Sequence, residues 1–143
     1  MTKLEYKSLK TTQEIIPTLS LLNQMYPGIT PQEYRKAIEE MTQNNGYKML
    51  AVYSEGELVA ICGFWILRMF YCGKYLQISN LVVDENCRSQ NIGAKILEYF
   101  ENYAKDQGCD HITLDSYIDN TRSHEFFKKQ GFYVRGLHFM KKI

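Results

Sequence analysis

The chain has 143 residues, a formal net charge of +1, 45% hydrophobic residues and 23% charged residues. This length allows a core that needs no disulfides, and the composition is that of an ordinary soluble globular protein. A net charge so close to zero produces no field that would attract nucleic acid or an anionic membrane, so we expect neither as a partner.

The cysteines and the hydropathy pattern exclude two further classes of protein. The four cysteines form no CxxC pair and have no histidine cluster beside them, so the sequence predicts no metal site. We find neither a signal peptide nor an apolar stretch long enough to span a bilayer, which favours a cytoplasmic location. No repeat or flexible linker interrupts the pattern, and we expect a single domain over residues 1–143.

The first part of the chain predicts a short strand over about Lys3 to Leu9, followed by two helices. The first helix ends at Pro27-Gly28, and its apolar face is formed by Ile15, Leu19, Leu22 and Tyr26. The second helix begins with a capping box, Thr30 with Glu33, and ends at Asn45-Gly46. Together the two helices are expected to form one layer.

Aromatic and β-branched residues then predict a meander of strands. Lys48 to Tyr53 is the first strand, Ser54-Glu55-Gly56 a tight turn, and Glu57 to Phe70 a long return strand. The return strand is apolar on both faces, which is typical of a strand covered on both sides. After a turn over Tyr71 to Lys74, a further strand is expected over Tyr75 to Asp84.

This last strand changes the phase of its alternation. Leu76 and Ile78 keep one alternation, whereas Leu81 and Val83 keep the opposite one. A period of two residues changes phase only where an extra residue is inserted, so we predict a β-bulge near Ser79-Asn80. A bulge bends the strand away from its neighbour and exposes backbone N–H and C=O groups to a ligand.

The remaining elements are a helix from about Ile92 to near Gly108, a strand over His111 to Tyr117, and a short helix from about Thr121 to Gln130. A final strand is expected over Phe132 to about Met140. This order of elements predicts a mixed α/β (α+β) fold, with a mixed sheet and helices on both of its faces.

The stretch from Leu81 to Ala94 is a strand, a loop and a helix start, an arrangement suited to phosphate. The N-terminus of a helix presents unpaired N–H groups and the positive end of the helix dipole, so it can bind a pyrophosphate. Gly93 removes a side chain at the point where backbone and phosphate must approach closely, although a single glycine before an apolar helix more often relieves helix–strand packing.

Arg88 to Ala94 resembles the pyrophosphate-binding motif Arg/Gln-x-x-Gly-x-Gly/Ala of the GNAT superfamily of N-acetyltransferases. Arg88 and Gly93 match fixed positions of this motif, while Asn91 stands where the family usually has its first glycine. Asparagine tolerates left-handed backbone angles better than most residues, so we expect the loop to form.

A second stretch, Asn120 to Phe132, is similar to the family's Asn-x-x-Ala-x-x-Phe-Tyr…Gly-Phe pattern. The resemblance implies that Asn120 contacts the pantetheine of the coenzyme, and a helix N-cap is the equally weighted alternative. The bulged strand resembles the family's splayed strand, where pantetheine pairs with the backbone of Leu81 and Val83. The resemblance therefore implies a mixed, mostly antiparallel sheet with splayed central strands.

The same resemblance implies an activity: transfer of an acetyl group from acetyl-CoA, as cosubstrate, to a primary amine by direct attack in a ternary complex. No metal takes part. The residues that it implies for coenzyme binding are Leu81, Val82, Val83, Arg88, Ser89, Gln90, Asn91, Ile92, Gly93, Ala94, Asn120, Ser123 and Phe127.

The sequence departs from the family at two catalytic places. Phe127 occupies the position of the tyrosine that often protonates the leaving thiolate, and Ser79-Asn80 occupies the region where many members have a carboxylate. Asp115 and Tyr117 are the candidate substitutes, although an aromatic residue at a sheet rim is the favoured alternative for Tyr117. Two further candidates are His124 and Glu85.

Two other functions stay open: a catalytically degenerate sensor that binds acyl-CoA, and a protein-interaction module without coenzyme. The acceptor amine, on a small molecule or a protein, is expected beside the helix pair near Pro27–Met41 and the loop around Tyr71–Tyr75. The acidic residues Glu33, Glu39 and Glu40 could attract a cationic amine, and they fit an ordinary solvated helix face equally well. Dimers are common in the family, so a homodimer is a further possibility.

Overall fold

The sheet is built from strands that follow one another in sequence. A computed structural model describes residues 3–143, apart from the side chain of Ser89. Its five strands lie in the order β1-β2-β3-β4-β5, and the first four pair antiparallel. Their bounds are β1 Leu4–Leu9, β2 Lys48–Ser54, β3 Glu57–Met69, β4 Gly73–Val83 and β5 His111–Leu114. The backbone divides into two compact units, the first reaching to Thr113 and the second being Leu114–Ile143.

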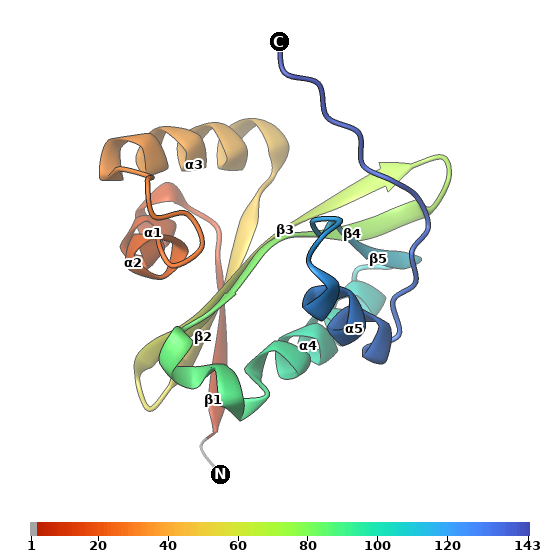
Figure 1. The fold of residues 1–143 in the computed structure, drawn as a ribbon. Helices are drawn as coiled ribbons and strands as arrows, with labels where there is room; N and C mark the ends of the chain where they lie inside the picture. The colour runs from red at the N-terminus through yellow and green to blue at the C-terminus, as the bar shows by residue number, and fades with distance from the viewer. Residues whose placement is uncertain (1–2) are drawn as a thin grey trace. The chain divides into compact units, whose positions relative to one another are not determined.

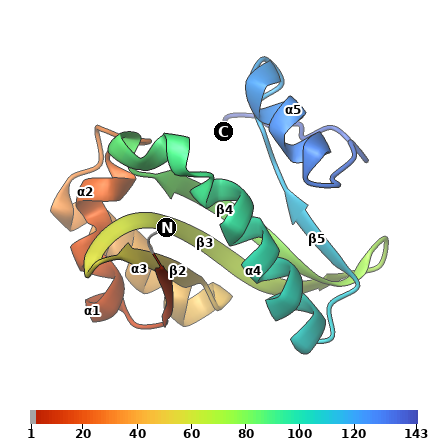
Figure 2. The same cartoon turned by 90° about the horizontal axis from the view of Figure 1, so that it is seen from below.

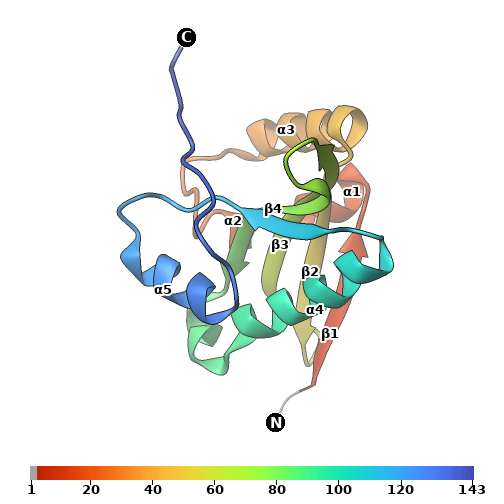
Figure 3. The same cartoon turned by 90° about the vertical axis from the view of Figure 1, so that its right-hand side faces the viewer.

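Helices cover both faces of the sheet in the first unit (Figure 1). Their bounds are α1 Thr12–Ile15, the 3₁₀ helix η1 Ile16–Thr18, α2 Leu19–Leu22, α3 Pro31–Asn45, the 3₁₀ helix η2 Glu85–Gln90 and α4 Ile92–Asp106. On one face, Ile15, Leu22 and Ile38 pack against Met49 and Ile61 of the sheet. Figure 3 shows the sheet between this helix layer and α4. The predicted mixed fold with helices on both faces is confirmed.

The opposite face is covered by α4, whose ring-bearing residues pack on β3. The rings of Phe64 and Phe100 meet edge to face, with centroids 5.0 Å apart, and α4 lies along the sheet in Figure 2. Ile92, Ile96 and Phe100 are at most 1% exposed. The predicted extent of this helix is confirmed, because it ends at Asp106, just before Gly108 with φ of 74°.

The first predicted helix is wrong in detail, because the chain breaks it. It forms α1, η1 and α2 in succession, with Pro17 inside η1. Proline lacks an N–H and crowds the preceding turn, so it interrupts a continuous α-helix. Tyr26 lies beyond α2 and is 40% exposed, so it does not belong to the buried face.

The start of α3 is confirmed as a capping box. Thr30 Oγ1 accepts a hydrogen bond from Glu33 N at 3.2 Å, and Glu33 Oε2 accepts one from Thr30 N at 2.9 Å. Gly46 ends the helix in the left-handed conformation, with φ of 69°. The short α1 has the same device, formed by Thr11 and Glu14, which the sequence analysis did not predict.

The turn between β2 and β3 is confirmed at Glu55 and Gly56, whose φ angles of 51° and 80° are both positive. A two-residue turn with two positive φ angles matches the twist of antiparallel strands. The following strand is buried on both faces only in its first half, from Val59 to Phe64. Beyond Leu67 it is exposed, so the predicted coverage on both sides applies to part of the strand.

The predicted β-bulge is confirmed in β4. Cys62 pairs with Leu81 and Phe64 pairs with Ile78, so one residue of β3 lies opposite two residues of β4, Ser79-Asn80. Cys62 and Phe64 lie two apart on β3 and therefore share a face. Ile78 and Leu81 consequently point to that same face although they lie three apart, which is the phase change read from the sequence.

Two predicted strands differ in the second unit. The strand expected to Tyr117 ends at Leu114, and no strand forms over Phe132 to Met140. Strand-forming residues need a hydrogen-bonded neighbour, and no strand pairs with this segment in the described structure. Its large side chains are exposed, for example Phe139 at 87%. The short helix is confirmed as α5, Thr121–Lys129.

Candidate functional site

The loop between β4 and α4 curls back onto the end of β4. Asp84 Oδ1 accepts from Asn86 N at 3.0 Å, and Asp84 O accepts from Cys87 N at 2.8 Å, which closes the 3₁₀ helix η2. The exposed side chain of Arg88 donates from Nε to the carbonyl of Val83 at 3.4 Å. Arg88 therefore lies directly beside the end of the bulged strand.

Asn91 joins this loop to α4 in a left-handed conformation, with φ of 60° and ψ of 26°. The expectation that asparagine can form the loop in place of the family's glycine is confirmed. No described side chain caps the N-terminus of α4. The first N–H groups of this 15-residue helix, at Ile92, Gly93 and Ala94, are therefore suited to an anion. Gln90 is exposed beside them, and the side chain of Ser89 lies outside the described structure.

The bulge coincides with the point where β5 ends. Asp110 N donates to Lys74 O at 2.7 Å, and Thr113 Oγ1 donates to Gln77 Oε1. The two contacts advance by three residues on each strand, so β5 runs parallel to β4. Since β5 ends at Leu114, no strand of the described sheet continues beside Ser79–Val83. Backbone groups of this part of β4 lack a strand partner on that side, so they are open to pairing with an extended ligand.

The residues predicted on this edge differ in exposure. Val82 is 3% exposed and belongs to the core on the face of helices α1 to α3. Leu81 and Val83 are half-buried and point to the other face, through their pairing with Cys62 and Ala60. The backbone contacts with a coenzyme that the family resemblance implies for Leu81 and Val83 stay predictions.

A polar contact at the bulge was missed by the sequence analysis. Tyr47 donates from its hydroxyl to Asn80 Oδ1 at 2.9 Å, and both residues are at most 8% exposed. Gly63 of β3 provides the space, because a Cβ there would overlap the hydroxyl oxygen of Tyr47. Burial raises the pKa of Tyr47 far above its ordinary value. The one available signal was Gly63 itself, since glycine inside a strand often marks a close approach.

The loop and the helix layer are connected by one long-range contact. The side chain of Gln24, just after α2, accepts at Oε1 from Glu85 N at 3.0 Å. This bond brings the turn after α2 next to the loop that begins at the end of β4. The side of the sheet expected to receive an acceptor and the predicted pyrophosphate loop are thus adjacent within the first unit.

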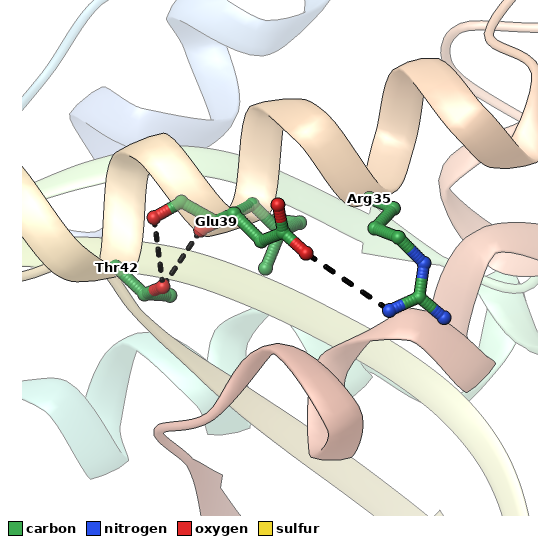
Figure 4. Close-up of polar contacts among 4 residues, drawn as sticks. Arg35, Glu39 and Thr42 are labelled. Carbon is green, nitrogen blue, oxygen red and sulfur yellow. Dashed lines mark hydrogen bonds and ion pairs between the residues drawn. The ribbon is translucent and has the colours of Figure 1, made fainter.

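Two of the three acidic residues of α3, Glu33 and Glu39, make local contacts. Glu33 is part of the capping box, and Glu39 Oε1 lies 4.0 Å from Arg35 Nη1 (Figure 4). Thr42, one turn further, donates to the carbonyl of Ile38 at 2.7 Å. The ion pair between Arg35 and Glu39 is exposed, and exposed ion pairs contribute little to stability. The contacts of Glu33 and Glu39 favour an ordinary solvated helix face over an acidic site for a cationic amine.

The other predicted site residues belong to the second unit. Asn120 caps α5, because its Oδ1 accepts from Ser123 N at 3.2 Å. The ring of Phe127 packs between Phe126 and Phe132, with centroids 5.3 Å and 5.8 Å away. The cap predicted for Asn120 is therefore observed, and the coenzyme roles of these residues stay predictions.

The two weak catalytic candidates lie in the same unit. Asp115 Oδ2 lies 3.6 Å from His138 Nδ1, and both side chains are more than half exposed. The carbonyl of Tyr117 lies 2.8 Å from His124 Nε2, while the Tyr117 side chain is 76% exposed. Neither candidate is held in a buried, polarised environment of the kind that tunes an acid or base.

Two classes of feature are not found among residues 3–143. No helix there is both long and apolar enough to cross a membrane. No group of three or more His, Cys, Asp or Glu side chains is arranged to hold a metal ion in that part of the chain.

The bulged strand, the left-handed loop residue and the uncapped helix follow one another along the chain, an arrangement that suits a ligand with a pyrophosphate group. Comparisons with known proteins identify the family. A sequence model described as the acetyltransferase (GNAT) family matches residues 16–132, which covers most of the chain. This chain belongs to the GNAT acetyltransferase family.

Individual relatives are similar over most of their length. The chain is 25% identical over 138 residues to an uncharacterized N-acetyltransferase, YhdJ, of Bacillus subtilis, covering 96% of this chain and 97% of that protein. It is 26% identical over 118 residues to glucosamine 6-phosphate N-acetyltransferase of Arabidopsis thaliana, covering 79% and 77%. The fold resembles that of aminoglycoside N-acetyltransferase AAC(6')-Iy in complex with CoA, with a TM-score of 0.80, 15% identity and coverage of 100% and 97%.

Proposed function

We propose that this protein transfers the acetyl group of acetyl-CoA to a primary amine of a small molecule or a protein, by direct attack in a ternary complex. One observation carries the proposal. The unpaired edge of β4 at Ser79–Val83 is followed, eight residues after Val83, by the left-handed Asn91 and the uncapped start of α4. Coenzyme A needs two features of this kind: a strand edge for the amides of its pantetheine and a cluster of N–H groups for its pyrophosphate.

The coenzyme would be held mainly by the backbone of the first unit. The N–H groups at the start of α4 and the side chain of Arg88 suit the pyrophosphate, because both favour negative charge. The backbone of Leu81 to Val83 suits the pantetheine. Coenzyme roles for Asn120, Ser123 and Phe127, which belong to the second unit, stay predictions from the family resemblance. A single acetyltransferase domain over residues 1–143 is part of this proposal, supported by a family match that spans both units.

In the proposed reaction, the amine nitrogen attacks the carbonyl carbon of the thioester. A carbon–nitrogen bond forms, the carbon–sulfur bond breaks, the amine loses a proton, and coenzyme A leaves as a thiol. Backbone N–H groups at the bulge stabilise the negative charge that develops on the carbonyl oxygen. Asp115 and Tyr117 are the proposed proton-transfer groups. Phe127 cannot donate a proton, so the leaving thiolate takes its proton from another group or from water.

The relatives support a small amine as acceptor, since two of them are named for glucosamine 6-phosphate and for aminoglycosides. The proposal also includes a cytoplasmic location, which the four unbridged cysteines support because disulfides are rare in a reducing compartment. A homodimer, frequent in the family, is its proposed assembly.

Thermal unfolding with and without acetyl-CoA tests the coenzyme site. A ligand at 100 times its Kd stabilises the folded state by about 2.7 kcal/mol. We expect that upward shift for the wild type and no shift for Arg88→Ala combined with Gly93→Val. The control, Arg35→Ala combined with Gly28→Val, changes the same residue types on the helix layer and should keep the shift. Retained binding in the Arg88/Gly93 variant would overturn the assignment of the pyrophosphate loop.

A sensor that binds acyl-CoA without turnover is the second candidate, and Phe127 is the observation that favours it. Thiol release measured with a panel of amines separates the two functions. Turnover with any amine excludes the sensor, whereas coenzyme binding without turnover supports it. For the enzyme, Phe127→Tyr should raise turnover and leave the affinity for coenzyme unchanged.

A further inference from the structure

The bulge brings together four residues on the face of the sheet that helices α1 to α3 cover. Tyr47 immediately precedes β2, Gly63 and Trp65 belong to β3, and Asn80 belongs to the bulge in β4. Tyr47 packs edge to face against Trp65, with ring centroids 5.1 Å apart, and its hydroxyl donates to Asn80 Oδ1 at 2.9 Å. Tyr47 is therefore in contact with both Asn80 and Trp65.

Two N–H groups at this point lack a partner. Neither Asn80 Nδ2 nor Trp65 Nε1 makes a hydrogen bond to any residue that the structure describes, and both atoms are buried. Asn80 is only 8% exposed. Buried donors without an acceptor cost folding free energy, and native structures contain few of them. Two in contact with one tyrosine indicate that the structure provides donors for a group that binds there.

The chemistry of the cluster favours an uncharged oxygen as that group. Burial raises the pKa of Tyr47, with smaller contributions from Tyr34, Cys62 and Tyr26, so its hydroxyl stays protonated and bound to Asn80. The hydroxyl group that contacts Asn80 is therefore neutral. N–H donors suit a hydroxyl or ether oxygen, which can accept a hydrogen bond, and offer nothing to an ammonium group, which can only donate.

The position of Asn80 connects this cluster to the proposed reaction. Asn80 is one of the two bulge residues, so it lies at the start of the strand edge proposed for the coenzyme arm. Its side chain lies on the face covered by the helix layer, together with Tyr47 and Val82. An acceptor bound through Asn80 would therefore have its neighbouring amine close to the bulge.

We infer that Asn80 and Trp65 form a neutral donor site that binds an oxygen atom of the acceptor. The acceptor class is an amine with a hydroxyl or ether oxygen next to its amino group, as in an amino sugar or an amino alcohol. This inference rests on the proposed function, because only an acetyltransferase would use the bound amine as an acceptor. Because both nitrogens are buried, binding needs a movement of the side chains that cover them.

Trp65 is the single tryptophan of the chain, so its fluorescence reports directly on this site. The experiment titrates the protein with glucosamine and with cyclohexylamine, which lacks the oxygen atoms, and follows Trp65 emission. Both titrations are made with and without saturating coenzyme A. We expect a saturable red shift with glucosamine only, because a hydrogen bond from the indole N–H to an oxygen stabilises its excited state. No shift with glucosamine in either condition, or equal shifts with both amines, would overturn the inference.

Two substitutions separate the donor role of Asn80 from a structural one. Asn80→Asp keeps an oxygen for the Tyr47 hydroxyl and removes the N–H donors, and Asn80→Ala removes both. Either variant should weaken glucosamine binding by about 10-fold, the effect of one lost hydrogen bond. Asn102→Ala makes the same change on α4 and should bind like the wild type. Unchanged affinity in Asn80→Asp would show that the donors are not used.

This experiment fails separately from the test of the proposed function. Loss of the acetyl-CoA thermal shift concerns the pyrophosphate loop and leaves the glucosamine titration without coenzyme intact. A thermal shift with acetyl-CoA, together with no response of Trp65 to glucosamine, would support the acetyltransferase function and overturn the inference of an oxygen-bearing acceptor.

Discussion

Tyr47 and Gly63 fit together so closely that only a hydrogen atom can occupy the side-chain position of residue 63. An added Cβ would overlap the hydroxyl oxygen of Tyr47 and crowd the amide of Asn80. The strand β3 therefore keeps a glycine at the place where its partner β4 bulges. The same glycine that weakens the strand allows a polar contact inside the sheet face.

Gly63→Ala tests this relationship. We expect a loss of about 1–3 kcal/mol in the free energy of unfolding, because overpacking forces Tyr47 or Asn80 from its position. Urea unfolding measures it. Gly28→Ala is the control, since nothing lies within 4 Å of its side-chain position, and it should change stability by no more than about 0.5 kcal/mol. Equal stability of both variants would contradict the fit.

Asn91 provides a prediction about the loop. Its left-handed conformation disfavours residues with a branched Cβ, so Asn91→Val should destabilise the fold by about 1–2 kcal/mol. Asn91→Gly should leave stability unchanged or slightly increased and preserve coenzyme A binding, because glycine adopts positive φ without strain. Thermal unfolding and a coenzyme A titration measure the two effects. A valine variant as stable as the glycine variant would be inconsistent with the left-handed loop.

Tyr47 makes stability depend on alkaline pH. Burial raises its pKa above the ordinary value of 10.0, so the folded protein keeps a proton that the unfolded chain loses. Stability therefore falls as pH rises above about 10, by about 1.4 kcal/mol per pH unit for one group. Tyr47→Phe should reduce this slope in urea unfolding between about pH 9.5 and 11.5. Near pH 7 both proteins should show no slope from this group, which serves as the internal reference. Identical alkaline slopes would argue against its burial.

The start of α3 should matter more than the charges along it. Thr30→Ala removes the cap and should cost about 1 kcal/mol of unfolding free energy. Glu39→Ala removes an exposed ion pair and should cost about 0.5 kcal/mol or less. Chemical denaturation of the two variants, side by side, measures the difference. The opposite order would mean that the ion pair is stronger than its exposure indicates.

Local signals predicted much of the fold. Thr30 with Glu33 predicted the start of α3, and the phase change between Ile78 and Leu81 predicted the bulge to the residue. The tolerance of asparagine for left-handed angles predicted the loop at Asn91. Each of these signals lies within a few residues of its effect, so one sequence is enough to find it.

Features that depend on distant partners were missed or wrong. The contact between Tyr47 and Asn80 joins residues 33 apart, and no local pattern announces it. The strand expected over Phe132 to Met140 has the right residues but lacks a paired neighbour in the described structure. Within the first helix, the local effect of Pro17 on the helical pattern was overlooked.

The order of the strands also has a kinetic consequence. Short turns join β2 to β3 and β3 to β4. The pairing of these three strands therefore closes small loops and has a low entropic cost. Strand β1 pairs with β2 across the whole helix layer and closes a much larger loop. We therefore expect the three-stranded meander to form early during folding. The bulge is part of that meander, so the strand edge proposed for the coenzyme forms before the helices that cover the sheet are docked.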